Sequence, residues 1–213
     1  MPLFQGKTFV TPRVFCIGCN YEAHIKEMNG SIPNDCVIFM KPSTALVNPN
    51  EVLYLPWNRG EVHYETEFVV RIGKRGKHIS KENALQHIDA WTLGFDLTIR
   101  TLQNKFKREG HPWELCKSFD QSAPIGEFIP IGNKDIQNTT FVGRVNSSVV
   151  QEGCTKDMIY PIDQLVSILS QTWELLEGDV IFTGTPPGIG KLCSGDILEA
   201  EADKAGCFRW TVM

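Results

Sequence analysis

The chain has 213 residues, of which 42% are hydrophobic and 22% are charged, and its formal net charge at pH 7 is −4. This is the composition of an ordinary globular protein, and the interspersed acidic and basic residues argue against a nucleic-acid-binding surface. No apolar run approaches the length of about 18 residues that a membrane-spanning helix needs, so we expect no membrane insertion.

The N-terminus and the cysteines indicate the compartment. The first residues lack the charged start and the unbroken apolar core of a signal peptide. The seven cysteines are scattered and odd in number, which is typical of a reducing compartment. Cys16 and Cys19 form a lone C-x-x-C, better explained by buried thiols than by a zinc or redox site. No linker or repeat divides the chain, so we expect a soluble, cytoplasmic protein with one domain over residues 1–213.

The predicted secondary structure consists mainly of strands. Runs rich in β-branched and aromatic residues predict strands at 14–18, 37–40, 67–73, 91–97, 139–150, 179–184, 196–202 and 207–212. Helices are expected within 18–30, capped by Asn20 and stopped by Gly30, after Ser80 over 81–88, from Thr98 to near Gly110, and over 161–176. Strands and helices do not alternate regularly, which favours a β-rich α+β fold over a doubly wound nucleotide-binding fold.

The stretch HYETEFVVRI, residues 63–72, places two carboxylates on one side of a predicted strand. Alternation puts Phe68 and its apolar neighbours on one face and Glu65 and Glu67 on the other. The two glutamates are then roughly 6.6 Å apart along the strand. Like charges this close stay ionised at neutral pH only if solvent or a cation stabilises them. The pattern therefore raises the question of what the pair faces.

Asp96 lies at the end of another apolar strand, just before a helix that carries Arg100 and Gln103 on one face. Alone, an aspartate in this position is commonly a helix cap. Together with Glu65 and Glu67, it completes a set of three carboxylates. Such a set supplies hard oxygen ligands suited to Mg²⁺, Mn²⁺ or Ca²⁺, and no His/Cys cluster competes for zinc.

His24 and Glu27 are three residues apart in the short helix expected within 18–30 and so share a face. A carboxylate beside an imidazole orients the ring and raises its basicity, which suits a base that activates water. The alternative is a surface ion pair worth a few tenths of a kcal/mol. A helix this short is marginal by itself, so it could become ordered only when the site beneath it closes.

The glycine-rich loop GTPPGIGK, residues 184–191, does not match a nucleotide-binding motif. A P-loop requires Gly five residues before the second Gly and Ser or Thr after Lys, whereas this chain has Thr185 and Leu192. The dinucleotide pattern fails at Cys193. The loop is interpreted as a tight turn after a strand, and a role in lining a site remains open.

These segments together resemble the fumarylacetoacetate hydrolase family, and in particular its compact acylpyruvase members. The resemblance covers essentially the whole chain, through the segments CIGCNYEAHIKEM, FMKPSTALV, HYETEFVVRIGK, DLTIRTLQ, PWELCKSFDQSAPIG, FTGTPPGIG and GDILEAE. It implies a mixed β-sandwich or β-roll with a few short helices, and a homodimer. It also implies that Glu65, Glu67 and Asp96 bind Mg²⁺ or Mn²⁺, which would answer the question posed by the glutamate pair.

The resemblance further assigns roles to individual side chains. His24 and Glu27 match the catalytic dyad of the family, on a segment expected to close over bound ligand. Lys117 resembles the lysine that stabilises developing negative charge. The positions that match the substrate pocket or lie near it are Lys41, Arg100, Gln103 and Thr185. One departure concerns the family pattern D-x-T-A-R-D-x-Q, where this chain has Ile99 and Thr101 in place of Ala and the second Asp.

The implied reaction is metal-dependent hydrolysis of the C–C bond of an acylpyruvate-type 2,4-dioxo acid, giving pyruvate and a carboxylic acid. The metal is expected to act as a Lewis acid, His24 as the base that activates water, and Lys117 as the group that offsets charge. Two alternatives use the same site without hydrolytic water, namely oxaloacetate decarboxylation and keto–enol tautomerisation. Isomerisation or hydration of aromatic-catabolism intermediates is a further alternative, and a non-catalytic metal-binding module is another.

Overall fold

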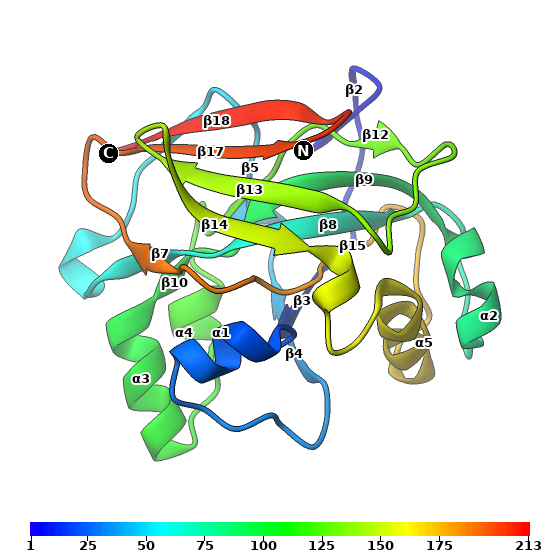
Figure 1. Ribbon diagram of the computed structural model, residues 1–213, viewed down its shortest axis with the longest axis horizontal. Coiled ribbons are helices and arrows are strands. Elements are labelled where there is room, and N and C mark those ends of the chain that lie inside the picture. The colour runs from blue at the N-terminus through cyan, green and yellow to red at the C-terminus, as the bar shows by residue number, and fades with distance from the viewer.

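Two β-sheets packed against each other organise the computed structural model, which describes residues 1–213 (Figure 1). The six-stranded sheet has the order β12 (Ile129–Pro130), β9 (Ile88–Phe95), β8 (Thr66–Ile72), β15 (Val180–Phe182), β3 (Val14–Gly18), β4 (Val37–Lys41). The five-stranded sheet has the order β14 (Ser148–Cys154), β13 (Thr140–Val145), β17 (Ile197–Ala202), β18 (Gly206–Val212), β6 (Val52–Leu53). Most neighbouring strands are antiparallel, but β15–β3 and β18–β6 are parallel, so the sandwich is mixed, as predicted.

Three small sheets complete the strand arrangement. They are formed by β1 (Leu3–Phe4) with β2 (Lys7–Thr8), by β10 (Thr98–Ile99), β7 (Val62–Tyr64) and β16 (Gly190–Lys191), and by β11 (Ala123–Pro124) with β5 (Leu46–Val47). The main core lies between the two large sheets. There the ring of Phe68 stacks on Trp91, with 5.1 Å between centroids, and also contacts Phe141 of the opposite sheet.

Five α-helices lie below and beside the strands in Figure 1. They are α1 (Glu22–Glu27), α2 (Lys81–Ala84), α3 (Arg100–Glu109), α4 (Glu114–Lys117) and α5 (Ile162–Thr172). Short 3₁₀ turns occupy Ser43–Ala45, Trp57–Arg59, Leu85–His87 and Thr155–Asp157. None of the helices has the length and apolar run that crossing a membrane requires.

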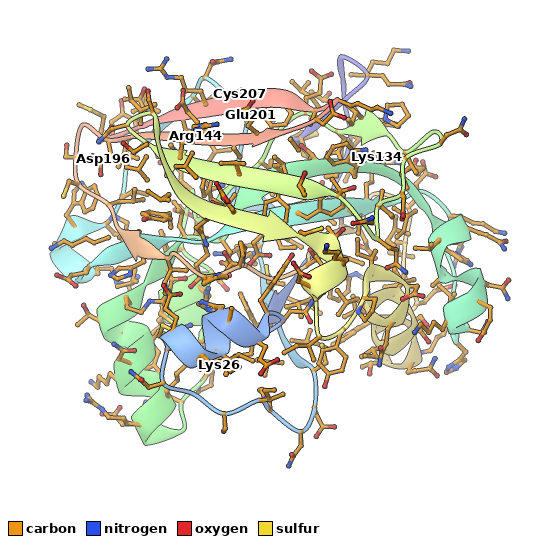
Figure 2. All side chains as sticks on the ribbon, viewed as in Figure 1. Lys26, Lys134, Arg144, Asp196, Glu201 and Cys207 are labelled. Carbon is orange, nitrogen blue, oxygen red and sulfur yellow. The ribbon has the colours of Figure 1, made fainter.

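The single helical run expected from Asn20 to Gly30 is shorter than predicted. Helix α1 starts after Tyr21, and Asn20 is not its cap. The buried Asn20 side chain instead donates to the carbonyl oxygens of Thr183 and Tyr160, at 2.7 and 3.1 Å. These bonds tie the start of α1 to the end of β15. Figure 2 labels Lys26 on α1, where it forms an exposed ion pair with Glu22.

Other helix boundaries also differ from the prediction. Thr98 and Ile99 form β10, so α3 starts at Arg100, although it ends at Gly110 as expected, with a left-handed φ of 68°. The segment after Ser80 is one α-helical turn followed by a 3₁₀ turn, and α5 ends at Thr172. Helix α4 was not predicted, because four residues are too few to establish a helical period.

The run 139–150, expected as one strand, is a hairpin. Strands β13 and β14 are joined at Asn146 and Ser147, whose φ angles of 51° and 66° are left-handed. Such angles suit a two-residue hairpin turn, and asparagine tolerates them best after glycine. The hairpin belongs to the five-stranded sheet. Figure 2 labels Arg144 and Glu201 there, which form an ion pair between β13 and β17 at 3.0 Å.

Candidate active site

The chain passes from a small sheet into the six-stranded sheet at Glu65. Strand β7 ends at Tyr64 and β8 begins at Thr66, so the expected continuous strand is broken at this point. The backbone N–H of Asp96 donates to the carbonyl oxygen of Glu65 at 2.8 Å, which joins the ends of β8 and β9. As a result, carboxylate oxygens of Glu65, Glu67 and Asp96 all lie within 4.8 Å of one another.

The three carboxylates are buried, although alternation along the strand suggested one apolar face and one polar face. Every residue of β8 is buried, because the strand lies inside its sheet with protein on both faces. Glu65, Glu67 and Asp96 are at most 5% exposed. A buried carboxylate requires compensating charge or hydrogen bonds. The cluster therefore depends on cations that approach it.

Basic side chains compensate two of the three carboxylates. Lys117 Nζ lies 2.7 Å from Glu65 Oε2 and 2.5 Å from Asp96 Oδ2. Arg100 forms an ion pair with Glu65, and Lys41 Nζ lies 2.9 Å from Asp96 Oδ1. These ion pairs were not predicted, because α3, α4 and β4 bring the three basic side chains in from distant positions.

Glu67 has no basic side chain within ion-pair distance. Its Oε2 accepts a 2.8 Å hydrogen bond from the backbone N–H of Gly184. Burial and the neighbouring charge of Asp96 raise the pKa of Glu67 well above its usual range. Burial alone would also raise the pKa of Glu65, but the charges of Lys117 and Arg100 hold it well below its usual range.

The donor set fits a divalent cation. Three carboxylates converge, and Glu67 has no cationic partner among the side chains around it. Carboxylate oxygens are the ligands that Mg²⁺, Mn²⁺ and Ca²⁺ prefer. Glu65, Glu67 and Asp96 could therefore hold such an ion.

His24 and Glu27 lie together on α1, as predicted. His24 Nδ1 is 3.2 Å from Glu27 Oε2, and the imidazole is buried. The other carboxylate oxygen, Oε1, accepts a hydrogen bond from the backbone N–H of Gly188 at 3.0 Å. Glu27 thus links the histidine to the glycine-rich loop and leaves the Nε2 atom of His24 free of this contact.

One cavity of about 240 Å³ contains most of the predicted site residues. His24, Glu65, Glu67, Arg100, Gln103, Lys117 and Thr185 line it. Lys41 and Asp96 lie behind the wall, where Lys41 donates to backbone carbonyl oxygens of Leu97 and Lys117. The structure therefore brings the candidate base, two of the three carboxylates and three of the four predicted substrate-binding residues into one pocket.

Several cavity residues were missed by sequence reasoning. Lys107 is exposed on α3 and also lines the cavity, where its ammonium lies 5.4 Å from the ring centroid of Trp113. Its spacing of seven residues from Arg100 was a usable signal. Cys19, expected to be buried, is half-buried in the cavity wall with a left-handed φ of 58°. Cys16 is buried, as expected.

The departures from the family pattern lie at the start of α3. Ile99 is buried, and Thr101 Oγ1 accepts a hydrogen bond from the N–H of Glu61 at 3.2 Å. The N–H of Arg100 donates to the carbonyl oxygen of Glu61 at 2.8 Å. Thr101 therefore fixes the helix start against the 60–61 loop and leaves Arg100 directed at Glu65.

Comparisons with known proteins identify the family to which the chain belongs. The family model for the fumarylacetoacetate hydrolase C-terminal domain matches residues 13–213. Oxaloacetate tautomerase YcgM of Escherichia coli is 42% identical over 204 residues, covering 94% of this chain and 93% of that protein. The mitochondrial oxaloacetate tautomerase FAHD1 of Bos taurus is 36% identical, covering 88% of this chain and 85% of that protein.

A solved structure has the same fold. Fumarylpyruvate hydrolase from Pseudomonas aeruginosa, determined in complex with Mn²⁺ and pyruvate, superposes with a TM-score of 0.94 at 34% identity. The match covers 99% of this chain and 94% of the other. The chain belongs to the fumarylacetoacetate hydrolase family of enzymes.

Proposed function

We propose that the protein is a divalent-metal-dependent hydrolase that cleaves acylpyruvate-type 2,4-dioxo acids into pyruvate and a carboxylic acid. One observation carries this proposal: a single cavity is lined by His24, which Glu27 contacts, and by Glu65 and Glu67 of the carboxylate cluster. A non-catalytic metal module would have no use for an imidazole oriented in this way. We propose Mg²⁺ or Mn²⁺ as the ion, with Glu65, Glu67 and Asp96 as ligands and a homodimer as the working form.

The bound ion supplies Lewis acidity that polarises the substrate oxygens and favours an enolate. The protein contributes the remaining chemistry. His24 accepts a proton from water, and Glu27 keeps the ring oriented and stabilises the imidazolium. The water oxygen bonds to the distal acyl carbon, and the C–C bond on the pyruvate side breaks. Its electron pair passes to the pyruvate fragment, which then takes a proton from the imidazolium.

Basic side chains suit the anionic substrate. Lys117 lies in the wall at the carboxylate cluster, where a cation offsets charge that develops on the enolate. Arg100 and Gln103 are hydrogen-bonded to each other and line the cavity on consecutive turns of α3. We assign them, with Thr185 and with Lys41 behind the wall, to substrate binding.

A second candidate function is keto–enol tautomerisation of oxaloacetate, with decarboxylation as a related reaction. The Escherichia coli relative named for this activity is 42% identical and covers nearly the whole chain, which favours this candidate. Tautomerisation needs the same electron sink and one proton-transfer group, but it needs no hydrolytic water.

A substrate panel tests both candidates. Acetylpyruvate, fumarylpyruvate and oxaloacetate are assayed with Mg²⁺, with Mn²⁺ and with EDTA, following loss of the dioxo-acid absorbance, oxaloacetate ketonisation and CO₂ release separately. We expect acylpyruvate cleavage that EDTA abolishes and that Mg²⁺ or Mn²⁺ restores. Turnover of oxaloacetate alone would replace the hydrolase proposal by the second candidate, and no turnover of any substrate would reject both.

A further inference from the structure

Thr66, the residue between two of the proposed metal ligands, is held by a side chain from the opposite sheet. Gln151 of β14 is 2% exposed, and its Oε1 accepts a 2.7 Å hydrogen bond from the N–H of Thr66. Gly143 on the neighbouring strand β13 permits this close approach, because a Cβ at that position would lie 2.0 Å from Thr66 Oγ1. The amide oxygen of Gln151 therefore fixes the backbone at the break between β7 and β8.

The other end of the same amide holds the glycine-rich loop. Gln151 Nε2 donates to Thr185 Oγ1 and to the carbonyl oxygen of Pro186, each at 2.8 Å. The hydroxyl of Thr185 in turn donates to the carbonyl oxygen of Thr66 at 2.9 Å. All the hydrogen-bonding groups of the Gln151 amide are thus used within the protein, which fixes its orientation.

The loop that Gln151 holds reaches the candidate base. Two residues after Pro186, the N–H of Gly188 donates to Glu27 Oε1 at 3.0 Å, and Glu27 Oε2 contacts His24. Gly188 has a left-handed φ of 100°, and a Cβ there would lie 2.1 Å from the carbonyl oxygen of Val150, the residue before Gln151. Strand β14 and the loop are therefore in direct contact.

We infer that Gln151 is a positioning residue that couples the carboxylate cluster to the His24–Glu27 pair. Its amide oxygen sets the backbone between Glu65 and Glu67, and its amide nitrogen sets the loop that holds Glu27. The inference rests on the proposed function only where it concerns catalysis. The two hydrogen-bonded connections can be measured whether or not the protein turns over a substrate. Gln151 contacts no proposed ligand or base itself and acts through Thr66, Thr185 and Pro186.

Two variants separate the two connections. Gln151→Met keeps the length of the side chain and removes both hydrogen-bonding ends. Gln151→Glu keeps an acceptor for the N–H of Thr66 but removes the NH₂ group that holds Thr185 and Pro186. Val149→Thr, at an exposed position of the same strand, is the matched control. Each protein is measured by Mn²⁺ calorimetry, by hydrogen exchange of residues 22–28 with oxalate and Mn²⁺, and by steady-state kinetics.

For Gln151→Met we expect Mn²⁺ affinity and kcat each to fall about tenfold, and exchange in residues 22–28 to accelerate by about the same factor, which corresponds to one lost hydrogen bond. Gln151→Glu should retain the Mn²⁺ affinity but show the faster exchange and the lower kcat, with KM nearly unchanged. If Gln151 had a merely structural role, both variants would have a lower melting temperature, and Mn²⁺ affinity would not differ between them.

Wild-type exchange and wild-type Mn²⁺ affinity in a folded Gln151→Met protein would overturn the inference. If Gln151→Met does not fold, equal loss of Mn²⁺ affinity and of exchange protection in Gln151→Glu would overturn it. Failure of the proposed function gives a different result, since the wild-type protein would then turn over no substrate while the calorimetric and exchange differences between variants persist.

Discussion

Lys117 Nζ lies 2.5 Å from Asp96 Oδ2, so the carboxylate cluster contains a cation supplied by the protein itself. Considered alone, three clustered carboxylates repel one another. The ion pairs of Lys117, Arg100 and Lys41 offset this repulsion at Glu65 and Asp96. It still applies to Glu67, and the three positions are therefore predicted to respond differently.

Glu67→Gln should stabilise the metal-free protein and remove most of its affinity for Mg²⁺ and Mn²⁺. The substitution removes a buried carboxylate that has no ion pair, while the amide oxygen can still accept from Gly184. Thermal unfolding in EDTA and Mn²⁺ calorimetry measure the two effects. Exposed Glu109→Gln serves as the control. Undiminished metal binding in Glu67→Gln would contradict the ligand assignment.

Glu65→Ala should destabilise the protein by about 3–5 kcal/mol, the usual cost of removing one partner from a buried ion pair. The reason is that Arg100 and Lys117 lose their shared carboxylate while remaining buried. Urea unfolding in EDTA gives the free energy of unfolding. A stability equal to that of the wild type would mean that water reaches these cations.

His24→Ala should lower acylpyruvate hydrolysis by roughly 10²–10⁴, the usual contribution of a general base. Oxaloacetate decarboxylation should be spared more, because CO₂ leaves without water activation. Glu67→Ala should abolish both reactions. Replacement of the exposed His111 by alanine is the control. If His24→Ala lowers both reactions equally, His24 serves a shared proton transfer and its role in water activation is wrong.

Residues from about Tyr21 to Met28 should gain hydrogen-exchange protection when oxalate and Mn²⁺ bind. A six-residue helix is marginal alone, and α1 lines the cavity with His24 and Ile25 and is bonded to Gly188 through Glu27. Helix α5 is the internal reference, since it is remote from the cavity residues. Equal protection in α1 with and without oxalate would argue against closure on binding.

Lys107→Met should raise KM for fumarylpyruvate about tenfold and leave KM for acetylpyruvate nearly unchanged. Among the basic residues that line the cavity, Lys107 alone forms no ion pair with a carboxylate, so it is available for a second carboxylate of the substrate. A charge-assisted hydrogen bond is worth about 1.5–3 kcal/mol. Lys105→Met, on the exposed side of α3, is the control. An equal change for both substrates would show that Lys107 does not distinguish them.

Sequence reasoning located most of the longer strands and the β-rich class, and the fold class is confirmed by the structure and its relatives. It succeeded where local pattern decides the outcome, as at Gly110, where a glycine ends α3. It failed where partners are far apart in sequence. Asn20 is an example: its amide bonds to Tyr160 and Thr183 override its local preference for a helix cap.

The site residues show the same contrast between local and distant contacts. The pairing of His24 with Glu27 follows from helical spacing and could be predicted. The Lys117–Asp96 contact and the bond from Thr66 to Gln151 join residues 21 and 85 positions apart, and no local pattern encodes them. The glycine-rich loop was understood as a turn, but its contact with Glu27 depends on how the two sheets pack.

Helix α3 and the sheet strands supply different parts of the candidate site. Arg100, Gln103 and Lys107 lie on successive turns of one helix face and line the cavity, whereas the carboxylates belong to the sheet strands and their ends. Arg100 is ion-paired with Glu65 and hydrogen-bonded to Gln103, so changes at these two positions also reach the carboxylate cluster. Lys107 forms no such pair, so a change there can alter the cavity wall while the carboxylates keep their partners.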